Sequence, residues 1–232
     1  MDFVYFVRHG DNEELRYSIR SVIKHFPDAK IWVLGNKPDW YTGNFVPVRN
    51  VGEKFTNIAN CCYEAATHPE ISDTFVWMND DFFIMKPIES ILPLHRGSLK
   101  ERADRYAQGI STSYYNKLLH ATYSQLIKMG IEDPLDYDVH MPLVMDKKGT
   151  LEALKTTRIG RTLPRSMYGN LSSIGGSKVG DVKVYSSSAF AFKSYDYLNG
   201  DFPYLSTEDS SFDDVYENVL KDAFPDPSPY EK

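Results

Sequence analysis

The sequence predicts a single α/β domain built on a mostly parallel β-sheet with helices on both faces. Three apolar segments indicate buried strands, at residues 3–7, 30–36 and 74–85. Helical patterns lie between them, after Asp11 and at residues 54–67. Strands that alternate with helices at this spacing are typical of parallel sheets, because each connection must cross over the sheet. A chain of 232 residues, 42% of them hydrophobic, is long enough to bury the core of such a domain.

The first strand and the first helix have clear patterns. Residues 3–7 form a continuous run of aromatic and β-branched side chains, as expected for a strand buried on both faces. We expect Asp11 to cap the following helix, with Glu14 three residues later completing a capping box. Apolar residues then recur at helical spacing on one face: Leu15, Ile19, Val22, Ile23 and Phe26. Pro27 ends this helix.

The next elements complete the predicted sheet. Residues 30–36 form a second buried strand, and residues 45–48 form a short strand whose proline indicates an edge position. A helix follows at 54–67, and then the apolar strand 74–85, which Asn79-Asp80-Asp81 interrupts. Ligands of such sheets bind beyond the carboxyl ends of the strands, and both this triplet and Arg8-His9-Gly10 lie at such ends.

The second half of the chain has weaker patterns. We expect loops in two polar segments, a mobile one at 95–109 and one rich in glycine and serine at 161–181. We expect helices at 115–129 and towards the end of 136–154, a strand at 182–192, and a last helix within 202–220.

Composition excludes several classes of protein. The formal net charge of −6 provides no general field for a nucleic-acid backbone. The two cysteines, Cys61 and Cys62, are adjacent and too few for a structural zinc site, which indicates small buried thiols in a cytosolic protein. No segment has the ~20 apolar residues of a membrane span, and the N-terminus lacks a signal-peptide pattern. We therefore expect a cytoplasmic protein.

The tripeptide Arg8-His9-Gly10 resembles the signature of the histidine phosphatases, in which the histidine accepts the phosphoryl group. That chemistry also needs a second histidine late in the chain. The remaining histidines all precede the last third of the sequence, at His25, His68, His95, His120 and His140. A phosphatase is therefore a minor alternative, and His9 is better interpreted as a loop residue.

Asp80 and Asp81 carry the stronger signal. Two carboxylates end an apolar strand, and hydrophobic residues resume at once. Burying them unpaired would be costly, whereas Mg²⁺ or Mn²⁺ binds carboxylate oxygens and shares its remaining positions with phosphate. The alternative is a strand end with one aspartate in a local salt bridge. The position also resembles the Asp-x-Asp element of GT-A glycosyltransferases, in which a metal bridges carboxylate and diphosphate.

Three segments resemble the Stealth-type capsular polysaccharide phosphotransferases: residues 12–40, 75–88 and 139–148. The chain is also similar to small glycosyltransferase-like proteins encoded by bacteriophages, which would place it in a bacterial host cytoplasm. The resemblance implies a GT-A-like, Rossmann-like fold and a nucleotide-sugar donor, expected to be UDP-linked. Stealth proteins usually begin with a Trp-Val-Asp-Gly-like segment where this chain has Val7-Arg8-His9-Gly10. Transfer of a sugar and transfer of a sugar phosphate therefore both remain open.

Strand-end positions and the resemblance together suggest roles for individual residues. Donor contacts are expected from Arg8, Gly10, Asp11, Arg16, Asn36, Lys37 and Asn79. The expected metal ligands are Asp80, Asp81 and His140, and the candidate bases are Asp138 and Asp209. Structural alternatives exist for three of these residues: Asp11 as a helix cap only, Arg16 as a surface arginine, and His140 as a buried, hydrogen-bonded histidine.

The sequence thus predicts a metal-dependent glycosyltransferase that moves a sugar from a nucleotide sugar to an acceptor hydroxyl. Residues 1–94 would form the donor-binding half of the domain, and residues 95–232 the acceptor side with mobile loops. The alternatives are a hexose-1-phosphate transferase and a non-catalytic protein that binds glycans or nucleotide sugars. A glycan, a protein and a modified nucleic acid all remain open as the acceptor, and so does the oligomeric state.

Overall fold

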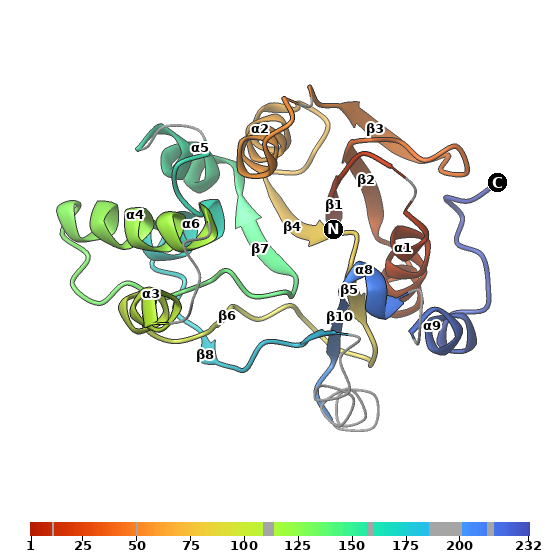
Figure 1. The fold of residues 1–232 in the computed structure, drawn as a ribbon. Helices are drawn as coiled ribbons and strands as arrows, with labels where there is room; N and C mark the ends of the chain where they lie inside the picture. Colours follow the sequence, from red (N-terminus) through yellow and green to blue (C-terminus); the bar gives the residue numbers. More distant parts are fainter. Residues whose placement is uncertain (11, 50, 109–113, 157–159, 186–200, 213–215) are drawn as a thin grey trace.

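The computed structural model describes every residue except 11, 50, 109–113, 157–159, 186–200 and 213–215. Its centre is a five-stranded sheet of order β3-β2-β1-β4-β7 (Figure 1). These strands span Asn44–Pro47, Lys30–Gly35, Asp2–Val7, Thr74–Asn79 and Leu143–Asp146, respectively. All neighbouring pairs run parallel except β4 and β7, which are antiparallel. The predicted mostly parallel α/β fold is confirmed, and β3 is an edge strand as its proline indicates.

Two helices cover opposite faces of this sheet. Side chains of β1 alternate between the faces, as they must in a strand. Phe3 and Tyr5 pack with α1 (Glu13–His25), whereas Val4 and Phe6 pack with α2 (Lys54–Thr67). The continuous apolar pattern of residues 3–7 therefore reflects a strand buried on both sides.

The order of the strands creates a binding position. From β1 the chain moves outward through β2 and β3 and then returns to place β4 on the other side of β1. The carboxyl ends of β1 and β4 therefore lie side by side at the point where the strand order reverses, which is where such sheets leave a crevice for ligands. Gly35 keeps this edge compact, because its φ of 107° favours glycine and a Cβ atom there would collide with the carbonyl oxygen of Val7.

A smaller sheet brings late parts of the chain to the same edge. It has the order β5-β10-β9, in which β5 is Phe82–Ile84, β10 is Tyr204–Thr207 and β9 is Lys183–Val184. Strand β5 follows the two aspartates directly, and Phe82 pairs with Ser206 of β10. Residues more than a hundred positions later in the chain therefore lie beside the end of β4.

The remaining elements form the rest of the domain. They are β6 (Leu94–His95), α3 (Leu99–Gln108), α4 (Tyr114–Lys128), α5 (Lys147–Lys155), α6 (Pro164–Leu171), β8 (Ser177–Lys178), α8 (Asp209–Ser211) and α9 (Glu217–Ala223). None of the helices in the described residues combines the length and apolar character needed to cross a membrane.

Both predicted loops of the second half are wrong in part, because each contains a helix. In 95–109, α3 buries Leu99 and Ala103 among the residues whose burial is described, and its polar side chains concealed the helical pattern. In 161–181, Pro164 starts α6 at a favoured helical position, and Gly169 lets the helix pack closely on the ring of Tyr137. Of the predicted strand 182–192, only residues 182–185 are described, and β9 lies within them.

Candidate functional site

A cleft of about 660 Å³ opens at the carboxyl ends of β1, β2 and β4. This volume lies within the range of small-molecule sites. Its walls contain seven of the residues predicted from the sequence: Arg8, Asn36, Asn79, Asp80, Asp81, His140 and Asp209. Residues from both halves of the chain therefore meet at one place.

Asp80 is held from the first helix. Asn12, and not the predicted Asp11, caps α1, and its side-chain oxygen accepts a hydrogen bond from the Leu15 amide. The amide group of Asn12 donates to Oδ2 of Asp80 at 2.5 Å, and Nε of Arg8 lies 3.7 Å from the same oxygen. Burial and the neighbouring Asp81 raise the pKa of Asp80 to about 6. A cation near this carboxylate would relieve the cost of its charge.

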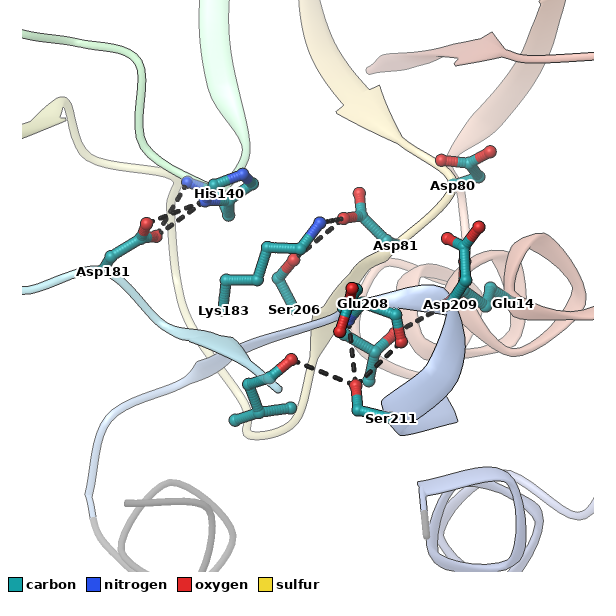
Figure 2. A network of polar contacts seen from close by, with 12 residues as sticks. Glu14, Asp80, Asp81, His140, Asp181, Lys183, Ser206, Glu208, Asp209 and Ser211 are labelled. Carbon is teal, nitrogen blue, oxygen red and sulfur yellow. Dashed lines mark hydrogen bonds and ion pairs between the residues drawn. The ribbon is translucent and has the colours of Figure 1, made fainter. Parts of the chain in front are cut away.

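Asp81 is held by the smaller sheet (Figure 2). Its Oδ2 accepts hydrogen bonds from Nζ of Lys183 at 2.9 Å and from the hydroxyl of Ser206 at 3.1 Å. The local salt bridge considered as the structural alternative is therefore present at this aspartate. These contacts all involve Oδ2. Among the described residues, no side chain donates a hydrogen bond to Oδ1 of Asp80 or to Oδ1 of Asp81. Each acid thus has one hydrogen-bonded oxygen and one to which no described side chain donates.

Arg8 lies among three carboxylates. Its guanidinium is 2.5 Å from Asp209, 3.7 Å from Asp80 and 3.9 Å from Glu14. Glu14 is buried and accepts a hydrogen bond from Thr207, and burial is the main reason why its pKa is raised to about 8. Among the described residues, the ion pairs of these three acids and of Asp81 involve two cations, Arg8 and Lys183, and the lining of the cleft also contains Arg49 and Lys54.

His140 is oriented by a carboxylate. Its Nδ1 lies 2.9 Å from both carboxylate oxygens of Asp181, and Arg96 lies 2.9 Å from the same carboxylate. Burial alone would raise the pKa of Asp181, but the hydrogen bond from His140 and the charges of His140 and Arg96 hold it well below its usual range. Figure 2 shows the ring with one edge towards Asp181 and the other towards the side where Asp81 and Lys183 lie.

Other predicted donor contacts lie around the cleft or outside it. Asn36 lines the cleft and contacts the exposed His9, whose Nδ1 is 3.2 Å away, and it also donates to the carbonyl oxygen of Gly10 at 3.4 Å. Asn79 lines the cleft and accepts a hydrogen bond from Trp77. Gly10 is not among the lining residues. Asp11 lies outside the described residues, so its donor contact stays a prediction.

Three further predicted site residues, besides Gly10, do not line the cleft. Arg16 binds Glu13 and Glu231 and stacks on Trp40, so it anchors the end of the chain. Lys37 is exposed and lies over the ring of Phe45. Asp138 is hydrogen-bonded by the hydroxyl of Tyr115 and is not brought to the cleft.

The predicted metal ligands do not by themselves form a metal-binding cluster in the described part of the chain. Within the described residues, no three His, Cys, Asp or Glu side chains are placed to hold a metal ion together, so the predicted set Asp80, Asp81 and His140 is not a preformed site. The free oxygens of the two aspartates are nevertheless the hard ligands that Mg²⁺ and Mn²⁺ prefer, and Mg²⁺ commonly binds through one or two carboxylates plus substrate phosphates.

Sequence reasoning missed the residues that hold the site together: Asn12, Glu14, Asp181, Lys183 and Ser206. One signal was available for Lys183, because a cation between Val182 and Val184 in an apolar strand needs a buried partner. Nothing in the sequence pairs the other partners with their targets.

No protein-family model matches the sequence, and no curated protein matches it. Among solved structures, the galactosyltransferase LgtC, determined with donor and acceptor sugar analogues, aligns with 99% of this chain and 98% of its own, at a TM-score of 0.48 and 11% identity. The glycosyltransferase GlyE from Streptococcus pneumoniae TIGR4, in its apo form, aligns with 88% of this chain and 53% of its own, at a TM-score of 0.36 and 14% identity. Both are glycosyltransferases, but likenesses this distant carry no argument about residues or activity.

Proposed function

We propose that the protein is a divalent-metal-dependent glycosyltransferase that moves a sugar from a nucleotide-sugar donor to a hydroxyl group. The observation that carries this proposal is the carboxylate pair at the end of β4. Asp80 and Asp81 face a cleft at the switch point of a parallel sheet, and each presents one oxygen that no other described side chain hydrogen-bonds. This is where such sheets bind nucleotides.

The metal would bind the free oxygens of Asp80 and Asp81 and complete its shell with oxygens of the donor diphosphate. Its chemistry would be to neutralise the charge that develops on the departing nucleoside diphosphate. Two side chains of the wall supply further positive charge near that group, Arg8 from the end of β1 and Lys183 from β9. Asn36, at the end of β2, offers an amide to the nucleoside.

The test is a hydrolysis assay with a panel of nucleotide sugars, UDP-linked donors included, with water as the acceptor. We expect release of free sugar with Mn²⁺ or Mg²⁺, loss of release in excess EDTA, and recovery when metal is restored. Full turnover in excess chelator would exclude the metal. Stabilisation of the protein by a nucleotide sugar with no turnover of any donor would identify a binding protein instead.

The nucleotide product separates the two kinds of transfer. Sugar transfer breaks the bond between the anomeric carbon and the diphosphate oxygen and releases a nucleoside diphosphate. Transfer of a hexose 1-phosphate, which the Stealth-like segments suggest, breaks the diphosphate linkage and releases a nucleoside monophosphate. We expect the nucleoside diphosphate, and chromatography of the spent reaction decides between the two.

A further inference from the structure

Direct transfer of a sugar to a hydroxyl group releases the hydroxyl proton, and a side chain that accepts this proton speeds the reaction. The two bases predicted from the sequence are poorly placed for this task. Asp138 is engaged by Tyr115 and does not line the cleft. Asp209 lines the cleft, but its side chain is 64% exposed and is ion-paired with Arg8 at 2.5 Å.

His140 is better placed for proton transfer. It lines the cleft together with Asp81 and Lys183, and its side chain is 32% exposed, so it can meet a substrate. The ring packs edge-on against Phe82, with their centroids 6.3 Å apart, which limits its rotation. The imidazole is thus held in one orientation at the wall of the cleft.

Asp181 determines which nitrogen carries the ring proton. Both of its oxygens lie 2.9 Å from Nδ1, and its ion pair with Arg96 fixes the carboxylate in turn. A carboxylate cannot donate to Nδ1, so in the neutral imidazole Nδ1 carries the proton and Nε2 carries the lone pair. Orienting a basic imidazole through a carboxylate on its other nitrogen is a recurrent catalytic arrangement.

We propose that His140 is the catalytic base of the transfer and that Asp181 is the residue that positions it; this inference rests on the proposed glycosyltransferase function. The hydroxyl oxygen of the acceptor bonds to the anomeric carbon of the donor while the hydroxyl proton moves to Nε2 of His140. The bond from the anomeric carbon to the diphosphate oxygen breaks, and the diphosphate leaves with the bonding electrons. The positive imidazolium is stabilised by Asp181.

The test uses donor hydrolysis, because water can replace the unknown acceptor at the same base. His140→Ala should lower turnover by at least 10²-fold, and 50–100 mM imidazole should restore a measurable part of it. Asp181→Asn should lower turnover by at least 10-fold with little change in the donor KM, because it removes the orienting carboxylate and not a donor contact. His120→Ala, which changes an exposed histidine of α4, is the matched control and should retain wild-type turnover and show no response to imidazole.

The outcomes separate this inference from the function on which it rests. If the wild-type protein turns over no nucleotide sugar, the proposed function fails. If it does, and His140→Ala retains full turnover, only the role of His140 fails. A metal-ligand role would instead raise the Mn²⁺ concentration for half-maximal turnover at least 10-fold in His140→Ala, with no rescue by imidazole, and that result would overturn the proposal. Melting temperatures of all variants show whether each one is folded.

Discussion

At the scale of single residues, the two strand-end acids differ in their surroundings. Asp80 is a buried carboxylate whose pKa is raised to about 6, and its main polar partner is the neutral amide of Asn12. Asp81 is bonded to a half-buried cation, Lys183. Removing the charge from one acid therefore relieves a cost, whereas removing it from the other leaves a lysine without its partner.

We expect Asp80→Asn and Asp81→Asn to change stability in opposite directions. Without added metal, Asp80→Asn should hold or raise the melting temperature, because it removes an unfavourable buried charge. Asp81→Asn should lower the melting temperature, because Lys183 is left uncompensated. Thermal unfolding at pH 7 measures both effects, and equal losses in the two variants would contradict this account.

Both substitutions should reduce metal-dependent donor turnover. We expect a loss of at least 10²-fold, about 2.7 kcal/mol of transition-state stabilisation, since each removes charge that the cation needs. Asp80→Asn then combines lost activity with retained stability, a pattern that a purely structural role for this acid does not produce. Normal turnover in both variants would show that neither aspartate is needed as a metal ligand.

At the scale of elements, the residue that caps the N-terminus of α1 also contacts an acid of the cleft. Asn12 uses its oxygen to cap the helix and its amide group to hold Asp80. One side chain therefore performs two tasks, which substitutions can separate. Ser retains the ability to cap and cannot donate to Asp80 in the same way, whereas Ala loses both functions.

We expect Asn12→Ala to lower the free energy of unfolding by about 1 kcal/mol, and Asn12→Ser to lower it much less. Both variants should weaken Mn²⁺ activation of donor turnover, because Asp80 loses its anchor in each. Asp146→Ala, which removes the cap of α5 and lies outside the cleft lining, controls for cap loss and should leave Mn²⁺ activation unchanged. Normal Mn²⁺ activation in Asn12→Ser would show that the hydrogen bond from Asn12 to Asp80 is not needed for metal activation.

The elements of the first half could be predicted because their patterns are strong. The helix predicted at 54–67 has those bounds, and the strand–helix alternation predicted the sheet and the edge where Asp80 lies. The second half could not be predicted as well, because α3 and α6 owe their stability to packing on the rest of the domain. The same limit applies to the site. Lys183 and Asp181 reach it through tertiary contacts that no local pattern encodes.

At the scale of the whole molecule, the end of the chain is fastened to its beginning. The side chain of Glu231 is only 4% exposed and binds Arg16 and Arg20 of α1, at 2.9 and 2.6 Å. Nearby, the hydroxyl of Tyr230 donates to the carbonyl oxygen of Ala29 and accepts from the amide of Ile31. These contacts fix the side of α1 and β2 that lies away from the cleft.

The ion pairs of Glu231 with Arg16 and Arg20 should weaken at low pH. Burial alone would raise the pKa of Glu231, but hydrogen bonds from Arg20, Ser228 and Arg16 lower it to about 2, below its ordinary value of 4.5. A lowered folded-state pKa contributes stability above the unfolded value, and that stability is lost as the pH falls from about 4.5 towards 2. Glu231→Gln should therefore cost about 2 kcal/mol at pH 7 and progressively less below pH 4.5.

Denaturant unfolding from pH 7 to pH 3 measures this difference. Glu217→Gln, which removes the acid of an exposed ion pair with Lys221 on α9, is the matched control and should change stability little at any pH. A cost for Glu231→Gln that stays constant across this range would show that the carboxylate charge is not what fastens the chain.

The pairing of Asp81 with Lys183 and Ser206 has a consequence for biosynthesis. The lysine lies 102 positions after the aspartate and the serine 125 positions after it. A ribosome that has released the first hundred residues has delivered both strand-end acids but neither partner of Asp81. Asp81 therefore remains without these two partners until β9 and β10 emerge and join β5. The polar contacts around Asp81 can therefore be completed only after Ser206 has left the ribosome.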